Sequence, residues 1–174
     1  DGWHVPSDAE WTELTNYVSS QSQYVCGEDE DYIAKALASE EGWISSTDNC
    51  AVGYNPITNN ATGFSARPAG IYDGFDDGYY NFFGNNAYFW SATLRYSNDA
   101  YDRRLYYGNA YVDRGSIYRD YGYSVRCVRN EEGSGSEGGD DNPDDNDTTI
   151  TAQACPGVPT VTDVDGNVYN TVQI

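Results

Sequence analysis

The chain has 174 residues, a formal net charge of −19 and an aromatic content of 15%, with 17 Tyr and 4 Trp. This charge argues against nucleic acid and anionic membranes as partners, and no stretch reaches the roughly 18 apolar residues of a membrane-spanning helix. The length suits one domain with appendages, and the aromatic, Lys-poor composition favours sheet and ordered loops.

Two helices are expected near the start of the chain. The first opens with a capping box of Ser7 and Glu10 and runs from about Asp8 to about Ser20. Its inward face repeats at helical spacing through Trp11, Leu14, Thr15 and Val18. The second is expected from Glu30 to Glu40 and is ended by Gly42. Its inward residues are expected to be Ile33, Ala34, Leu37 and Ala38.

Residues 44–86 are rich in Gly, Asn, Asp and aromatic side chains and are expected to form long ordered loops. From Ala87 onward, three Tyr-rich stretches predict strands separated by polar turns: AYFWSATLR, AYDRRLYYGNAYV and YGYSVRCVR. Helices, then loops, then an antiparallel meander predict an α+β domain with a small, aromatic-rich sheet. We assign this body to residues 1–130.

An acidic linker is expected next, over residues 131–154. All nine basic residues lie between Lys35 and Arg129, whereas residues 131–147 hold eight acids and no apolar side chain. Such a segment cannot bury enough surface to fold, and its charges keep it extended. The chain between Asn130 and Pro159 spans up to roughly 90 to 100 Å when fully extended, which is enough to reach another subunit.

The C-terminal tail, residues 155–174, is expected to form a strand, a tight turn at Asp165–Asn167, and a second strand. Two strands alone are at best marginally stable in water, so this tail needs a surface to dock on. The residues expected to form the donated strands are Val161, Val164, Val168, Tyr169, Val172 and Ile174.

Four motifs in the body resemble the Fibrobacter succinogenes major paralogous domain: GWHVPSDAEWTEL from Gly2, GFSARPAGIYDG from Gly63, YFWSAT from Tyr88 and YGYSVRCVR from Tyr121. The resemblance implies a C-type-lectin-like fold and a secreted or surface protein of Fibrobacteres or Bacteroidetes with a structural or adhesive role. VTDVDGNVYNTVQI, from Val161, resembles the first strand of the same family, without the Gln-Cys-Trp segment that follows it there. A first-strand sequence thus stands after the linker, and none stands ahead of Gly2.

The resemblance also implies a docking place for the tail, because the first and last strands of lectin-like folds pair. We expect the tail to lie antiparallel to residues 123–129, either in its own chain or in a neighbour. The expected strand-acceptor residues are Tyr123, Val125 and Cys127.

The four cysteines allow three disulfide pairings. Cys26 follows the first expected helix and Cys50 follows the second. A disulfide between them closes a local loop that contains the second helix, so we favour this pairing. By the family resemblance Cys127 lies in a strand competent for a disulfide, and Cys155 is its expected partner, within one chain or between subunits. The alternative is two free thiols.

Enzyme signals are weak, and no catalytic residue is assigned. His4 is the single histidine, so triad chemistry would depend on one residue beside Trp3. Acidic clusters at residues 73–77 and 163–167 leave calcium open, but neither has the EF-hand pattern, so no metal site or cofactor is assigned. The Glu-Pro-Asn and Trp-Asn-Asp triplets of sugar-binding calcium sites are absent.

Glycans are expected on exposed polar segments. Two Asn-x-Thr triplets mark Asn60 and Asn146, and the Asp-Thr-Thr sequence at residues 147–149 marks Thr148 for O-linked sugar. These triplets, the absence of Met and the lack of CxxC spacing favour an exported protein.

We therefore expect an extracellular or cell-surface bacterial protein that is a subunit of a homopolymeric filament, with identical copies as its partners. In this reading each copy donates its C-terminal strand to the next, by β-augmentation. An adhesin or carbohydrate-binding module is the alternative, and a third reading makes the tail the start of a further tandem repeat.

Overall fold

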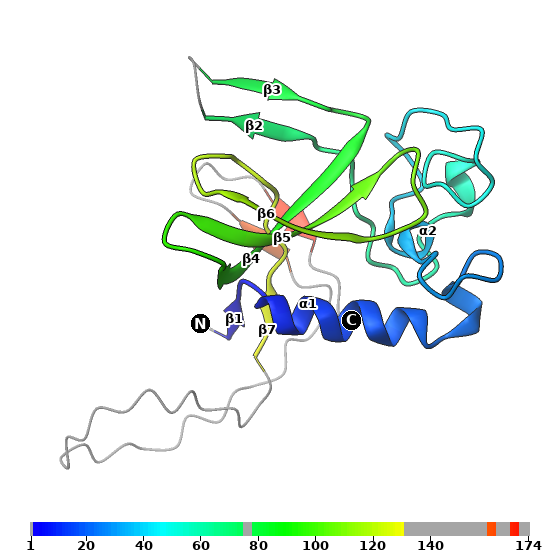
Figure 1. Cartoon of the computed structure of the whole chain (residues 1–174), viewed down its shortest axis with the longest axis horizontal. Helices are drawn as coiled ribbons and strands as arrows, with labels where there is room; N and C mark the ends of the chain where they lie inside the picture. Colours follow the sequence, from blue (N-terminus) through cyan, green and yellow to red (C-terminus); the bar gives the residue numbers. More distant parts are fainter. Residues whose placement is uncertain (1, 75–77, 131–159, 163–167, 171–174) are drawn as a thin grey trace, which may run out of the picture. The chain divides into compact units, whose positions relative to one another are not determined.

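The computed structural model describes residues 2–74, 78–130, 160–162 and 168–170 (Figure 1). The chain forms two compact units, residues 1–132 and 133–174. The elements of the first unit are β1 (Trp3–His4), α1 (Asp8–Ser19), η1 (Ser22–Tyr24), α2 (Ala34–Leu37), η2 (Pro56–Thr58), β2 (Ile71–Asp73), β3 (Tyr79–Asn81), β4 (Asn86–Leu94), β5 (Asp99–Tyr106), β6 (Asp113–Tyr118) and β7 (Val128–Arg129). The second unit contains β8 (Thr160–Thr162) and β9 (Val168–Asn170).

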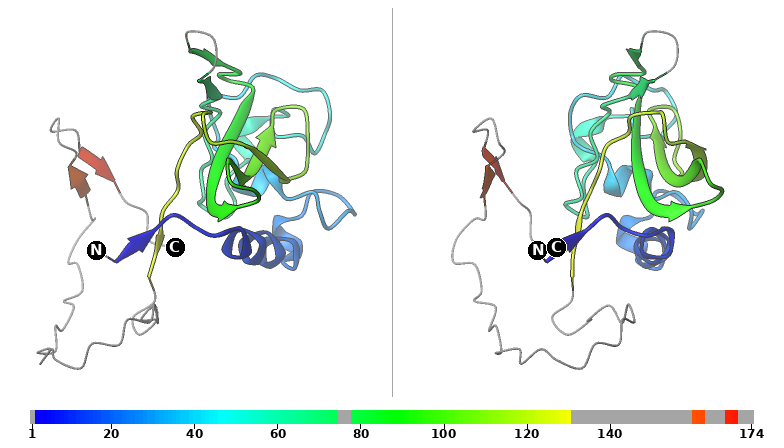
Figure 2. Two further views of the ribbon diagram at one scale, coloured as in Figure 1. Left: turned by 60° about the vertical axis from the view of Figure 1, so that its left-hand side comes forward. Right: turned by 90° about the vertical axis from the view of Figure 1, so that its left-hand side faces the viewer.

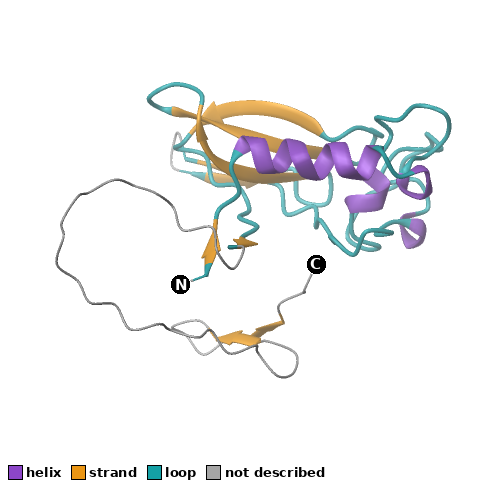
Figure 3. Cartoon of the chain, turned by 90° about the horizontal axis from the view of Figure 1, so that it is seen from below, coloured by secondary structure: helices purple, strands orange, loops and turns teal. Residues whose placement is uncertain are grey.

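The centre of the body is the antiparallel sheet β4-β5-β6, with α1 along one face (Figure 3). Side chains alternate across a strand, so Phe89 of β4 and Leu105 of β5 face the core. Phe89 meets Trp11 of α1 and Phe64 of the loops, and the three ring centroids lie 5.7 to 5.9 Å apart. This aromatic triangle joins helix, sheet and loops in one core and confirms the α+β class.

The first helix is confirmed. Ser7 caps α1, its hydroxyl accepts from the Glu10 N–H at 3.2 Å, and the Glu10 carboxylate accepts from the Ser7 N–H at 2.7 Å. Trp11 and Val18 are buried, as their spacing predicts.

The second helix is shorter than predicted, since α2 is a single turn. Asp29 ends the helical pattern on one side, since its carboxylate accepts from the Asp31 N–H at 3.1 Å in a local turn. On the other side Ala38 is extended and bridges Ala66. The predicted inward residues are nevertheless buried: Ile33, Ala34, Leu37 and Ala38.

The strand predictions hold for β4 and β5, whereas β6 was not predicted and the last stretch is mostly not a regular strand. Residues 113–118 begin with Asp113, Arg114 and Gly115, and because Asp and Gly are uncommon in strands, composition alone does not predict a strand there. The loops between residues 44 and 86 also carry β2 and β3, which pair as a hairpin (Figure 2). No helix in the described residues is long and apolar enough to cross a membrane.

The tail contains the expected pair of strands. β8 and β9 are antiparallel, with Val161 opposite Tyr169 and Thr162 opposite Val168. In the described part of this unit they form a two-stranded sheet by themselves.

Candidate functional site

The predicted strand-acceptor residues lie on residues 122–130, called here the last segment. It runs extended from β2, past the edge of β4, to β1 (Figures 1 and 2). Three separate elements therefore hold it in place.

The backbone hydrogen bonds of the last segment come from its even-numbered residues. Gly122 exchanges bonds of 2.9 and 2.8 Å with Tyr72, Ser124 donates to Tyr88 at 3.0 Å and accepts from Trp90 at 3.1 Å, Val128 pairs with His4, and Asn130 donates to Gly2 at 2.9 Å. In an extended strand the backbone groups of residues i and i+2 point to the same side. The body thus occupies one edge of the last segment.

The other edge is open. Tyr123, Val125 and Cys127 make no backbone hydrogen bond to any described residue. Their N–H and C=O groups alternate with those of Gly122, Ser124 and Val128, so in an extended backbone they are directed away from β2, β4 and β1. Arg126, between Val125 and Cys127, also makes no backbone hydrogen bond to a described residue. A row of unpaired backbone groups of this kind is a template for strand addition.

The side chains of the three residues differ in their surroundings. Tyr123 stacks on Tyr88 and Trp90, with ring centroids 4.7 Å away in each case, and burial raises the pKa of its phenol. Val125 is 54% exposed, and Cys127 is an exposed free thiol. The open edge therefore has a half-buried, stacked aromatic ring at one end and an exposed apolar side chain and an exposed thiol at the other.

The tail was expected to lie antiparallel to residues 123–129, and that docking stays a prediction. Within the body the end of this stretch already has a partner, because β7 pairs with β1. The pairing stops after two residues because the chain turns away through Val5 and Pro6. The Pro6 carbonyl accepts from the Ala92 N–H at 2.8 Å, and proline has no N–H to extend the ladder.

His4 has a structural role at this junction. One ring nitrogen lies 2.7 Å from Asn130 Oδ1 and the other 2.6 Å from Glu10 Oε1. Both hydrogen bonds raise the pKa of His4 above its ordinary value of 6.5, and the bond to Asn130 has the larger effect. The ring ties β1 to the cap of α1 and to Asn130, the last described residue of the body.

Sequence reasoning missed two charge networks, one that ties the sheet to α1 through Asp8 and one within β5 around Asp102. Arg114 makes a two-pronged contact with Asp8 at 2.7 to 3.1 Å, and buried Arg103 donates to the same carboxylate at 2.7 Å. Hydrogen bonds from Arg114, against an opposing effect of burial, lower the pKa of Asp8. On the other face of β5, the Arg104 guanidinium donates two hydrogen bonds, of 2.7 and 2.9 Å, to the carboxylate of Asp102, which is fully buried. The clustering of arginines in one strand was the available signal.

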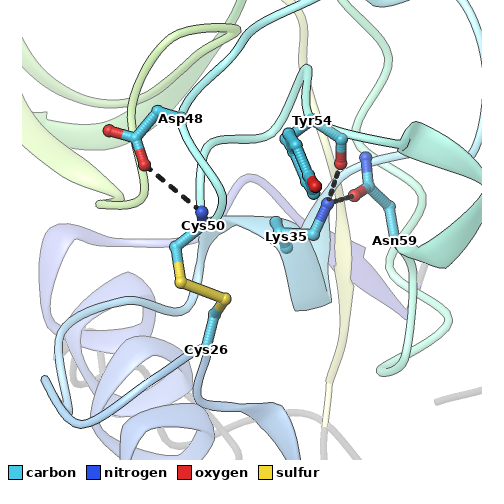
Figure 4. The surroundings of a disulfide bond; sticks show 6 residues. All are labelled: Cys26, Lys35, Asp48, Cys50, Tyr54 and Asn59. Atoms are coloured by element: carbon cyan, nitrogen blue, oxygen red, sulfur yellow. Dashed lines mark hydrogen bonds between the residues drawn. A yellow bond between two sulfur atoms is a disulfide. The ribbon is translucent and has the colours of Figure 1, made fainter.

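The predicted Cys26–Cys50 disulfide is confirmed (Figure 4). The two Cα atoms lie 5.6 Å apart, and the bond closes a sequence separation of 24 residues. It links the turn after α1 to the loop before Tyr54. In the same region Lys35 donates to the Asn59 side chain at 2.8 Å, which ties α2 to η2.

Several other predicted residues lie outside the described residues: Cys155, Val164, Val172, Ile174, Asn146 and Thr148. The Cys127–Cys155 pairing therefore stays a prediction. Val161 lies in β8, and Val168 and Tyr169 lie in β9.

The Asn60 triplet has a structural use in the loops. Asn60 Oδ1 accepts from the Ser65 N–H at 2.7 Å, and the Thr62 hydroxyl donates to the Ala36 carbonyl at 2.7 Å. Its glycosylation stays a prediction. Of the acids in the cluster at residues 73–77, Asp73 is described, and the described residues contain no cluster of three or more metal-ligating side chains.

A polar groove lies between α1 and residues 111–114, with a volume of about 260 Å³. Its polar side chains are Thr15, Asn16, Ser19, Asp31, Tyr111, Asp113 and Arg114. Burial raises the pKa of the Asp113 carboxyl. No sequence motif indicated this groove.

The body is thus a small, disulfide-bonded α+β domain with one open strand edge. A family model, the Fibrobacter succinogenes major domain, matches residues 1–129, and the chain belongs to this family. No curated protein and no solved structure matches the chain.

Proposed function

We propose that this protein is a secreted structural subunit of an extracellular filament, in which the tail of one copy adds a strand to the last segment of the next. The body has a C-type-lectin-like fold in this proposal. The observation that carries it is the open backbone edge formed by Tyr123, Val125 and Cys127.

The tail suits this edge. A two-stranded sheet is at best marginally stable alone, so β8 and β9 gain from joining a larger sheet. The three residues with free backbone groups alternate over residues 123–127, so β8 or β9, with three consecutive residues each, can pair with part of this edge. Main-chain hydrogen bonds would supply affinity, and Val125, half-exposed beside the edge, would supply an apolar contact.

Donation between copies is favoured over folding back. The 29 residues between Asn130 and Thr160 span roughly 95 Å at full extension, and connections longer than about 15 residues are usually functional or linkers. A contact between a tail and a different surface of the next copy is head-to-tail and does not close, so it propagates as a fibre. The disulfide suits an oxidising, extracytoplasmic setting.

A proline scan of the open edge tests the proposal. Val125→Pro removes one free N–H without breaking any hydrogen bond of the body, so the fold should survive. We expect its affinity for a synthetic peptide of residues 158–174 to fall about tenfold, because the variant loses about one hydrogen bond to the peptide and weakens the adjacent ones. Negative-stain imaging should show the loss of fibres.

Val125→Ala is the matched control, because it keeps the N–H and removes only part of the side chain. It should retain fibres. Fibres of wild-type length from the proline variant would contradict strand addition at this edge.

Sugar binding is the second candidate, and the polar groove beside α1 favours it. Hydroxyl, amide and carboxylate side chains are the groups that bind sugar hydroxyls, and Asp113 lies in the groove. A glycan array, run with and without calcium, should identify a ligand whose signal falls in Asp113→Asn. Equal signals from wild type and variant would exclude the groove.

A further inference from the structure

The polar groove between α1 and residues 111–114 is richer in hydrogen-bond acceptors than in donors. The Thr15 hydroxyl donates to two carbonyls of the preceding turn of α1, at 3.1 and 3.2 Å, and the Ser19 hydroxyl donates to the Asn16 carbonyl at 3.1 Å. A hydroxyl has one hydrogen to donate, so the oxygens of Thr15 and Ser19 can only accept a hydrogen bond from a ligand. The groove therefore suits a ligand with several N–H or O–H donors.

Two carboxylates of the groove have no positive partner in the body. Asp113 is half-buried and Asp31 is exposed. All nine basic residues of the chain lie among the described residues, and none is within ion-pair distance of either carboxylate. Burial raises the pKa of Asp113, and the charge of Arg104, which is bonded to Asp102, offsets this only in part. A positive charge beside Asp113 would stabilise its ionised form.

Arg114, which also lines the groove, is already paired. Its guanidinium donates to the Asp8 carboxylate at 2.7 to 3.1 Å and lies 3.9 Å from the centre of the Tyr101 ring. The groove also lies along the C-terminal half of α1, where the helix dipole is negative, and the last turn of α1 has no basic residue. These charges favour a positively charged ligand over an acidic one.

Tyr111 gives the groove an aromatic wall. Its ring is 37% exposed and is held by an edge contact with the Tyr32 ring, with centroids 5.0 Å apart. A ring held in this way offers a flat apolar surface beside polar groups, which is what the C–H face of a sugar ring contacts. The volume of about 260 Å³ is smaller than that of typical sites for drug-sized ligands and suits a single sugar ring.

We propose that this groove binds an amino sugar, with its protonated amine facing Asp113 and Asp31 and its ring against Tyr111. The sugar hydroxyls donate to the oxygens of Thr15 and Ser19. This inference rests on sugar binding, the second candidate function, and names the class of sugar. It does not depend on the filament.

The test is isothermal titration calorimetry of the full-length protein with three linear tetrasaccharides, of glucosamine, N-acetylglucosamine and glucose. The three share a ring, and only the first carries amines, which are largely protonated at about pH 6. The variants are Asp113→Asn and Asp31→Asn. Asp120→Asn is the matched control, because it removes an exposed carboxylate in the turn after β6, outside the groove. Thermal melting shows that each variant folds.

We expect the glucosamine oligomer to bind at least about tenfold more tightly than the other two, and each groove variant to lose about tenfold in affinity for it. The control should match wild type. A preference for glucosamine that survives in both groove variants would overturn the inference, because it would reflect attraction to the acidic protein as a whole. Equally tight binding of spermidine, an amine without a sugar ring, would also overturn it.

Failure of the inference and failure of sugar binding give different results. If all three oligomers bind equally and Asp113→Asn weakens each of them, the amine preference is wrong and sugar binding in the groove stands. If none of the three binds, both are wrong.

Discussion

Individual side chains divide between those that hold the body together and those that are largely exposed on its surface. His4, Asp8 and Asp102 each meet charged or amide groups at hydrogen-bond distance. Tyr80, Phe83 and Val125 are large and exposed. The first set predicts stability, and the second predicts association.

The raised pKa of His4 predicts that the folded body loses stability as the pH becomes alkaline. Its pKa is raised in the folded state, so its contribution is fully present below the ordinary value of 6.5 and is lost as the pH rises through the raised value. Asp8, whose pKa is lowered, contributes above its ordinary value of 3.8 and loses that contribution as the pH falls through the lowered value. Urea midpoints should therefore be highest between these two limits.

The single histidine allows a direct check by NMR titration of its ring. His4→Gln should remove the decline on the alkaline side and leave the acid limit unchanged. A His4 pKa at or below 6.5 would show that the junction with Asn130 and Glu10 does not form.

The buried ion pair of Asp102 and Arg104 predicts that removing the Asp102 carboxylate strongly destabilises the fold. Asp102→Ala leaves Arg104, itself largely buried, without its partner, and the free energy of unfolding should fall by about 3 kcal/mol. The exposed pair Arg67–Glu41 supplies the control, since Glu41→Gln should change stability by less than about 0.5 kcal/mol. Urea denaturation of both variants separates a buried pair from a surface pair, and equal losses would argue against the burial of Asp102.

At the scale of elements, local signals were the predictable ones. The capping box of Ser7 and Glu10 and the spacing of Trp11 specify α1 within a few residues, because the bonds that define it are local. α2 was predicted too long because its end at Ala38 depends on a bridge to Ala66, 28 residues away in sequence. The acceptor edge was named from a family resemblance. Its alternation of paired and free backbone groups depends on which strands lie beside it, and no local pattern records that.

Ser7→Ala tests the cap of α1. It should destabilise the body by about 1 kcal/mol, because the Glu10 N–H loses its acceptor and the Glu10 carboxylate loses a donor. Ser19→Ala, at the exposed end of the same helix, should be close to neutral. Thermal unfolding followed by circular dichroism measures both, and a neutral Ser7→Ala would mean that the Ser7 hydroxyl contributes nothing to the cap beyond the bonds from the Ser7 backbone N–H and His4.

The disulfide should stabilise the loop-rich half of the body. For a separation of 24 residues, the double change Cys26→Ser/Cys50→Ser should lower the free energy of unfolding by about 3 kcal/mol. Cys127→Ser, at an exposed thiol, is the control and should leave the stability of the body unchanged. A large loss from the control would show that Cys127 is bonded.

For the whole molecule, a net charge of −19 sets the conditions for assembly. Salt screens the repulsion between acidic copies but does not screen backbone pairing or apolar burial, so fibre formation should increase from low salt to about 0.5 M NaCl. Light scattering at increasing salt measures this. Dissolution of fibres by salt would indicate ionic contacts instead.

The last segment also determines how a fibre would respond to pulling. A donated strand along Tyr123–Cys127 lies parallel or antiparallel to the segment, so tension along it loads the new hydrogen bonds in shear, several at once, rather than one after another. The opposite edge of the segment is bonded at Gly122, Ser124 and Val128 to three different elements, which would pass the force into the central sheet and, through the core, to α1. A filament joined there would be expected to stretch in its acidic linkers before any body unfolds.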